Sequence, residues 1–209
     1  MTYEKHTQKR AEEQVEQKYF CHIRRPEFKR LLKEAYKIIN AELFHAELPS
    51  IRLNIAKFEK LPMQIVFGRF WVYQTVHGFY VVDDDPIDRL AEHPMIEISS
   101  NFAFFDADNP DITTFALFET LAHEMIHAYC YLNGICDHID GTNYHRYIFA
   151  EICERHGLIC EYRSVADGFA DTHLPWETYL KMMDCISHEV WDYVADNTTI
   201  SAKKRSEIG

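Results

Sequence analysis

Residues 120–129 read TLAHEMIHAY, and they lie in a segment whose apolar residues recur with helical spacing from about 111 to 132. Residues four positions apart on a helix share one face, with Cβ atoms about 5–6 Å apart. The rings of His123 and His127 are therefore predicted to reach one metal ion together. Glu124 lies one step round the helix from His123, where its carboxylate can take a proton from a water molecule at that ion.

The neighbours of this motif fit a helix with one buried face. Its apolar side chains are Phe118, Leu121, Ala122, Met125 and Ile126. The chain contains 12 His residues, so an H-E-x-x-H pattern can also arise by chance. The alternative interpretation is that the two histidines lie on a surface or interhelix face without a metal.

A catalytic zinc ion takes three protein ligands and leaves one position open. The simplest extension of the motif would need Gly at position 130 and His at position 133, but the chain has Cys130 and Asn133. The downstream candidates for a third ligand are Asp137, His138, Asp140, His145, Glu151 and Glu154. Imidazole is the commoner zinc ligand, and His145 opens a predicted helix after a glycine-containing loop. Spacing alone leaves several of these residues open.

The rest of the 209-residue chain predicts one α+β domain. An amphipathic helix is expected over about 27–44, and strands are expected at 51–58, 64–74, 78–82 and 94–100. Further helices are expected at 143–156 and at about 175–195, with residues 158–174 irregular between them. The apolar stripe of the last helix, which includes Trp176 and Leu180, should pack on the domain.

Charge and composition limit the partners. The chain carries 22 Lys and Arg against 33 Asp and Glu, a formal net charge of −11, which argues against a duplex-DNA grip. The basic segment HIRRPEFKR (22–30) is the one local candidate for a binding patch, and a solvated helix start explains it as well. No stretch approaches the ~18 apolar residues that span a bilayer, so a membrane is not an expected partner. Because of the acidic charge, nucleic acid is not an expected partner either.

The N-terminus and the cysteines both point to the cytoplasm. The first 18 residues are polar and lack the apolar core of a secretory signal. No two of the six cysteines have C-x-x-C spacing, so reduced thiols are expected. Cys130 and Cys153 fall at apolar helix positions and should act as small buried hydrophobes.

Residues 123–158, HEMIHAYCYLNGICDHIDGTNYHRYIFAEICERHGL, resemble the SprT-like family of zinc metallopeptidases. The family pattern is H-E-M-[IV]-H, a variable loop, and a His followed four residues later by Phe, here His145 and Phe149. Upstream, the resemblance includes ELFHAELPSIRLNI (42–55), FGRFW (67–71) and MIEISSNF (95–102). It covers about residues 27–160, and it favours His145 as the third ligand over His138 or Glu151.

The resemblance implies a zincin-like metallopeptidase domain at 27–160. This domain would have a small mixed sheet, an N-terminal helix, the HExxH helix and a following ligand helix. Residues 1–26 would be a polar extension, and 161–209 an extension whose amphipathic helix packs on the domain. Zn²⁺ would be held by His123, His127 and His145, with Glu124 as the general base of peptide hydrolysis. An extended peptide substrate would add to an edge strand near 95–99.

The sequence also offers candidate residues for two supporting roles. The oxyanion donor that peptide hydrolysis needs would come from Tyr144, Tyr147 or His173. Hydrogen-bond partners for the ligand rings would include Asp140 and Asp171. For each of these side chains, packing or solvation is an alternative explanation.

The resemblance is incomplete. Family members often carry a cysteine-rich zinc ribbon after this domain, but residues 161–209 contain only Cys185. No DNA-binding region is recognised, so a role in DNA repair is not expected.

Two other functions remain as alternatives. The first is a non-catalytic zinc-binding module for a protein partner, with a side chain from 161–175 over the metal. The second is a nucleic-acid-associated regulator with a basic surface stripe.

Overall fold

The computed structural model describes residues 20–22, 25–56, 68–75, 91–99, 104–106, 110–139 and 142–187. It is an α+β fold, as predicted from the sequence. The predicted strand 78–82, Asp140, and residues 188–195 of the predicted last helix lie outside these residues, as does most of the N-terminal extension.

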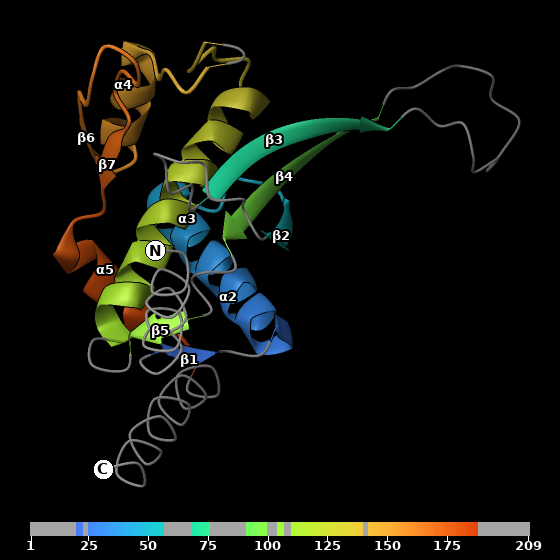
Figure 1. Ribbon diagram of the computed structural model, residues 1–209, viewed down its shortest axis with the longest axis vertical. Helices are drawn as coiled ribbons and strands as arrows, with labels where there is room; N and C mark the ends of the chain where they lie inside the picture. The colour runs from blue at the N-terminus through green and yellow to red at the C-terminus, as the bar shows by residue number, and fades with distance from the viewer. Residues whose placement is uncertain are drawn as a thin grey trace, which may run out of the picture.

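The main sheet has three strands in the order β2-β4-β3 (Figure 1). Strand β2 (Arg52–Ala56) is parallel to β4 (Ala91–Ser99), and β3 (Gly68–Thr75) is antiparallel to it. Residues Met95 to Ile98 pair on both sides, so the prediction that 95–99 is an edge strand is wrong. In this order, β3 has a neighbour, β4, on one side only within the described part of the chain, so it is an edge strand. It also contacts helix α3 (Pro110–Leu132).

Helix α2 (Arg25–Phe44) confirms the predicted helix over 27–44. Its buried residues recur at intervals of three and four, which lays one apolar face on the core: Phe28, Leu32, Ala35, Ile39 and Leu43. The side chain of Asn40 then bonds both the N–H and the carbonyl of Leu48, which directs the chain from the helix into β2. The predicted boundary after residue 26 falls inside this helix.

Helix α3 (Pro110–Leu132) is the centre of the fold and contains the H-E-x-x-H motif. Figure 1 shows it between the main sheet on one side and α4, β6 and β7 on the other. Leu117, Phe118, Leu121 and Met125 are fully buried in one cluster with Ile98 of β4. Burying side chains of this size stabilises a fold by about 1.5–3 kcal/mol each, so α3 is held firmly in place.

The C-terminal region departs most from the sequence prediction. Residues 158–174, predicted to be irregular, contain the antiparallel strands β6 (Ile159–Glu161) and β7 (Asp171–His173) after helix α4 (Tyr147–Arg155). The predicted domain boundary at residue 160 therefore falls inside a strand. A second small pairing, of β1 (Phe20–His22) with β5 (Phe104–Asp106), was also missed.

Helix α5 (Trp176–Met183) packs on the domain as expected, but it is shorter than predicted and uses a different face. Tyr179 is buried edge-on against Phe115 and Phe118, while Trp176 and Leu180 stay about half exposed. The aromatic contacts of Tyr179 fix the rotation of the helix, and this rotation turns the predicted stripe partly outward. Among the described residues, no helix combines the length and the apolar character that crossing a membrane requires.

Candidate functional site

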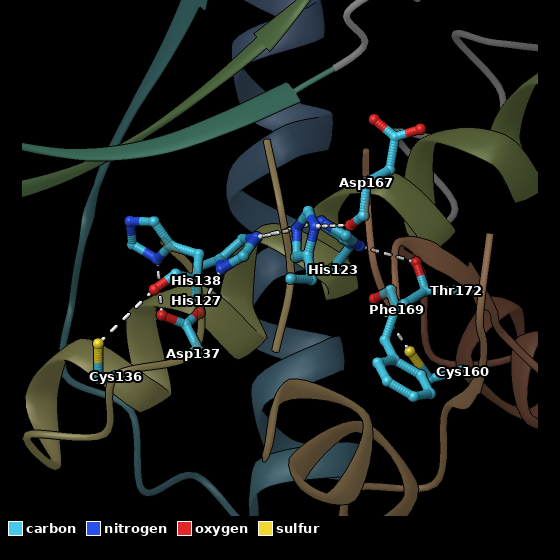
Figure 2. A network of polar contacts seen from close by, with 10 residues as sticks. His123, His127, Cys136, Asp137, His138, Cys160, Asp167, Phe169 and Thr172 are labelled. Atoms are coloured by element: carbon cyan, nitrogen blue, oxygen red, sulfur yellow. Dashed lines mark hydrogen bonds and ion pairs between the residues drawn. The ribbon is translucent and has the colours of Figure 1, made fainter. Parts of the chain in front are cut away.

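Three histidine rings converge at one point of the fold (Figure 2). His123 and His127 come from α3, four residues apart, and His145 comes from the extended segment before α4. The Nε2 atom of His127 lies 3.2 Å from Nε2 of His123 and 3.1 Å from Nε2 of His145. The structure therefore brings together the three residues predicted as ligands.

His145 reaches this point through a loop that holds its backbone on both sides. Its N–H donates to the Asp167 carbonyl at 2.9 Å, and its own carbonyl accepts from the Phe169 N–H at 3.1 Å. The predicted helix from residue 143 is wrong in this respect: the helix starts at Tyr147, because His145 forms isolated bridges with His138 and Gly168 instead. His145 is thus fixed by strand-like pairing.

Gly168 is what allows this close approach. Its φ is +66°, a backbone conformation that residues with a Cβ rarely adopt. A Cβ at this position would lie 2.1 Å from the carbonyl oxygen of His145. Any side chain here would therefore displace the backbone of a predicted ligand.

Each ring also has a partner at Nδ1, the nitrogen that faces away from the convergence point. The Oγ1 of Thr172, on β7, lies 2.8 Å from Nδ1 of His123 (Figure 2). Nδ1 of His127 lies 2.5 Å from Oδ2 of Asp137, and Nδ1 of His145 lies 3.4 Å from the Asp167 carbonyl. Second partners of this kind orient the ring of a metal-binding histidine and leave its other nitrogen for the ion.

Of the two predicted ring partners, Asp140 and Asp171, the structure describes only Asp171, and it does not contact a ring of the three histidines. Asp171 instead faces the guanidinium of Arg163, with 3.6 Å between Nε and Oδ1, and its neighbour Thr172 makes the contact with His123. Asp140 is not among the described residues. Asp137, considered from the sequence as a ligand, contacts a predicted ligand ring.

The arrangement of nitrogens fits a bound cation. Carboxylate and carbonyl oxygens only accept hydrogen bonds, so Nδ1 of His127 and of His145 must donate and carry the ring proton. In the neutral rings, both Nε2 atoms then present bare lone pairs to each other at 3.1 Å. A single proton on the central His127 could satisfy only one of its two neighbours, whereas one metal ion satisfies all three nitrogens.

The pKa values of two rings fall in the same direction. Burial, followed by the positive charge of the neighbouring histidines, lowers the pKa of His123 well below its usual 6.5. Burial and the charge of His127 lower the pKa of His145 to about 4. Neutral imidazole is the form that binds metals, so these rings are ready to act as ligands at neutral pH.

A tetrahedral zinc site separates its nitrogens by about 3.3 Å, given Zn–N bonds of about 2.0–2.1 Å, and the observed 3.1–3.2 Å is close to this.

Asp137 also binds a second ring, which makes a second potential metal group from His127, Asp137 and His138. Oδ1 of Asp137 lies 2.8 Å from Nδ1 of His138, in addition to the contact with His127. Burial would raise the pKa of Asp137, but its hydrogen bonds and charge interactions with the two rings outweigh burial and lower it. Both distances are those of hydrogen bonds to a carboxylate, so this group is a hydrogen-bond network.

Phe149 forms the floor beneath all three rings. It is fully buried, stacks on His127 with 4.7 Å between ring centroids, and tilts against His123 and His145 at 5.0 and 4.6 Å. The Phe four residues after His145 therefore packs on every predicted ligand. Its apolar face also excludes water from one side of the convergence point.

Glu124 lies under the edge of β3. Its side chain is 5% exposed and accepts a hydrogen bond from the Phe70 N–H. Burial raises the pKa of its carboxyl to about 7, partly offset by the charge of His127 and by this hydrogen bond. A Cβ on Gly68 would lie 2.9 Å from Oε1 of Glu124 and 2.8 Å from Cγ2 of Thr120. A glycine at this position is therefore what lets β3 lie so close to α3.

The structure does not bring the other predicted residues to the three rings. Tyr147 is exposed and packs against Phe169 at 5.3 Å between centroids, and the ring of Tyr144 lies against Gly168. Nδ1 of His173 lies 3.9 Å from Oε2 of Glu119. Glu151 and Glu154 are exposed on α4 and are not part of either histidine group.

Sequence reasoning missed Gly68, Gly168 and Thr172 as residues that shape this site. The glycine inside an aromatic strand pattern at 67–71 was a usable signal, since such a glycine often marks a close backbone approach. Thr172 carried no local signal, because its contact with His123 depends on a hairpin that was predicted to be irregular.

Comparisons of the chain with protein-family models, with curated proteins and with solved structures find no match.

Proposed function

We propose that this protein is a zinc-dependent metallopeptidase with a zincin-like domain of the SprT type. The observation that supports this most strongly is the convergence of three Nε2 atoms, each ring having its Nδ1 engaged elsewhere. His123, His127 and His145 would hold the ion. When bound, zinc supplies Lewis acidity: it polarises a carbonyl and lowers the pKa of a water molecule.

In this proposal Glu124 moves the proton. The carboxyl lies beside His123 in sequence, and burial raises its pKa to about 7 in the metal-free protein. The Phe70 N–H and the close approach of Gly68 hold the carboxylate in one place. Glu124 would take a proton from the attacking water and then pass it to the leaving amine.

The substrate would lie along β3. The expectation of a peptide beside 95–99 does not survive the sheet order, because β4 already pairs on both sides. Strand β3 has β4 on one side only within the described residues, and its Phe70 N–H points to Glu124. A peptide added to this edge would bind through its backbone and would bring a carbonyl to the three histidines with little sequence preference.

The test is metal content together with proteolysis, measured on the full chain. Wild type loaded with zinc should bind one equivalent and hydrolyse an unfolded protein such as labelled casein. Glu124→Gln should keep the zinc and lose about 10²–10⁴-fold in hydrolysis, because it removes the base and leaves the ligands. His127→Ala should lose both.

Glu151→Gln is the matched control, since it changes an exposed glutamate on α4 in the same way. It should keep both properties. Full hydrolysis by Glu124→Gln would show that the base is another residue. One equivalent of zinc in a wild type that hydrolyses nothing would favour the non-catalytic zinc module.

A further inference from the structure

Two aromatic rings pack against each other where β3 meets α3. The ring centroids of Phe70, on β3, and Tyr131, on α3, are 5.8 Å apart, and the ring planes meet at 51°. This separation is within the range of about 4.5–7 Å over which aromatic rings attract each other. Phe70 also packs on the hydrophobic core, but both side chains are only partly buried. The pair therefore presents part of its apolar surface to solvent.

This aromatic pair lies beside the residues of the proposed active site. Tyr131 follows His127 by four residues, so the two side chains are neighbours on one face of α3. Gly68, two residues before Phe70, lies against Glu124, because a Cβ there would be 2.9 Å from Oε1 of that carboxyl. Figure 1 shows the start of β3 lying against α3. Strand β3 thus passes from the proposed base to the aromatic pair between Gly68 and Phe70.

The pairing of β3 with β4 sets the direction in which a peptide on the other edge of β3 would point its side chains. Phe70 lies opposite Ile96, which is fully buried in the core. Residues directly opposite each other on neighbouring strands point to the same face of a sheet, and for Phe70 this is the face that meets Tyr131. Within the described residues, β3 has no strand on its other side. In a peptide added there, the residue beside Phe70 would point its side chain toward both rings.

We propose that Phe70 and Tyr131 form a specificity subsite, and that it takes one aromatic or large aliphatic side chain of an extended peptide substrate. This inference rests on the proposed function. Backbone pairing along a strand reads no side chain, so a preference comes from the surface that a side chain meets. A large apolar side chain would remove the open parts of both rings from water, whereas a charged one would lose its hydration there. Large apolar side chains are mostly buried in native proteins, so the substrates would be unfolded segments that expose them.

The first experiment tests the subsite on the metal-free full chain, without hydrolysis. A short Gly-Ser peptide with one central p-benzoylphenylalanine is irradiated with the protein, and the cross-links are mapped by mass spectrometry. They should fall within 68–72 and 128–132, and the same peptide with Phe, but not with Ala, should compete them away. Tyr131→Ala should reduce cross-linking about ten-fold, whereas Tyr162→Ala, which removes an exposed tyrosine that packs on Phe169, should not. Cross-links elsewhere, or equal competition by the Ala peptide, would overturn the proposal.

The second experiment tests the preference during hydrolysis by the zinc-loaded full chain. Wild type should cleave the Phe peptide with a kcat/KM about ten-fold or more above that of the Ala peptide. This ratio should fall toward one in Tyr131→Ala and persist in Tyr131→Phe and Tyr162→Ala, all with one equivalent of zinc. A ratio near one in wild type, or an unchanged ratio in Tyr131→Ala, would overturn the subsite. A wild type that binds zinc and cleaves neither peptide would instead refute the proposed function, and the cross-links would still decide whether the two rings bind a large apolar side chain.

Discussion

The hydroxyl of Thr172 lies 2.8 Å from Nδ1 of His123, although 49 residues separate them in the chain. The contact joins the H-E-x-x-H helix to β7, in a region that sequence analysis assigned to an extension. Asp167, from the same region, contacts the ring and backbone of His145. The residues that orient two of the three rings therefore lie beyond residue 160, and the site is complete only when this region is folded.

Replacing Thr172 with Val should weaken zinc binding about ten-fold, because Val keeps the shape and removes the hydroxyl that orients His123. Thr172→Ser keeps the hydroxyl and should bind zinc almost as wild type. Chelator competition on both variants measures the difference. Equal affinities for the Val and Ser variants would mean that the hydroxyl does not orient the ring.

Asp137→Asn should lower zinc affinity about 10–100-fold, since the carboxylate presents a separate oxygen to each ring, whereas the uncharged amide has one oxygen and an NH₂ group that cannot accept. His138→Ala removes only the second, exposed ring and keeps the contact between Asp137 and His127. It should bind zinc as wild type in the same assay. A comparable loss of zinc affinity in His138→Ala would mean that Asp137 acts through its contact with His138 and not through His127 alone.

Local patterns predicted well the parts of the fold whose reasons are local. The 3.6-residue spacing of apolar side chains gave α2 and α3 almost to the residue, and the spacing of His123 and His127 placed both on one helix face. His145 was selected through the family resemblance, because spacing alone left five other residues open. Its convergence with the other two rings depends on the bridge with Gly168.

Nonlocal pairing could not be predicted in the same way. The strands β6 and β7 have three residues each, too short for an alternating pattern, and only their mutual pairing defines them. The position of 95–99 within the sheet likewise depends on which strands flank it, and its apolar run fits a central or an edge strand. Thr172 is consequently the kind of residue that single-sequence reasoning does not find.

The buried carboxyl of Glu124 should make the metal-free protein less stable at high pH. Its pKa rises from 4.5 to about 7 on folding, so between these values the folded state holds more protons than the unfolded state. The free energy of unfolding must then fall as pH rises through this window. His145 acts in the opposite sense, since its pKa falls on folding from 6.5 to about 4.

Comparison with Glu124→Gln isolates the carboxyl, because both proteins keep the histidines. From pH 5 to pH 8, metal-free wild type should lose about 2–3 kcal/mol of unfolding free energy relative to this variant, measured by urea unfolding. Glu151→Gln, at an exposed site, should follow wild type at both pH values. A constant difference between wild type and Glu124→Gln would mean that the carboxyl titrates normally.

Two glycines with the same backbone angle allow the clamp on His145 to be tested separately from backbone strain. Gly134 and Gly168 both have φ of +66°, but a Cβ on Gly134 would meet nothing within 4 Å, whereas one on Gly168 would lie 2.1 Å from the His145 carbonyl oxygen.

Gly134→Ala should cost only the strain of a left-handed alanine, about 1–2 kcal/mol, and should keep its zinc affinity. Gly168→Ala should cost more in stability and should also lower zinc affinity at least ten-fold, because it pushes His145 out of place. Urea unfolding and chelator competition on the two variants give both quantities. A Gly168→Ala protein that binds zinc as tightly as Gly134→Ala would show that the loop does not position His145 as a ligand.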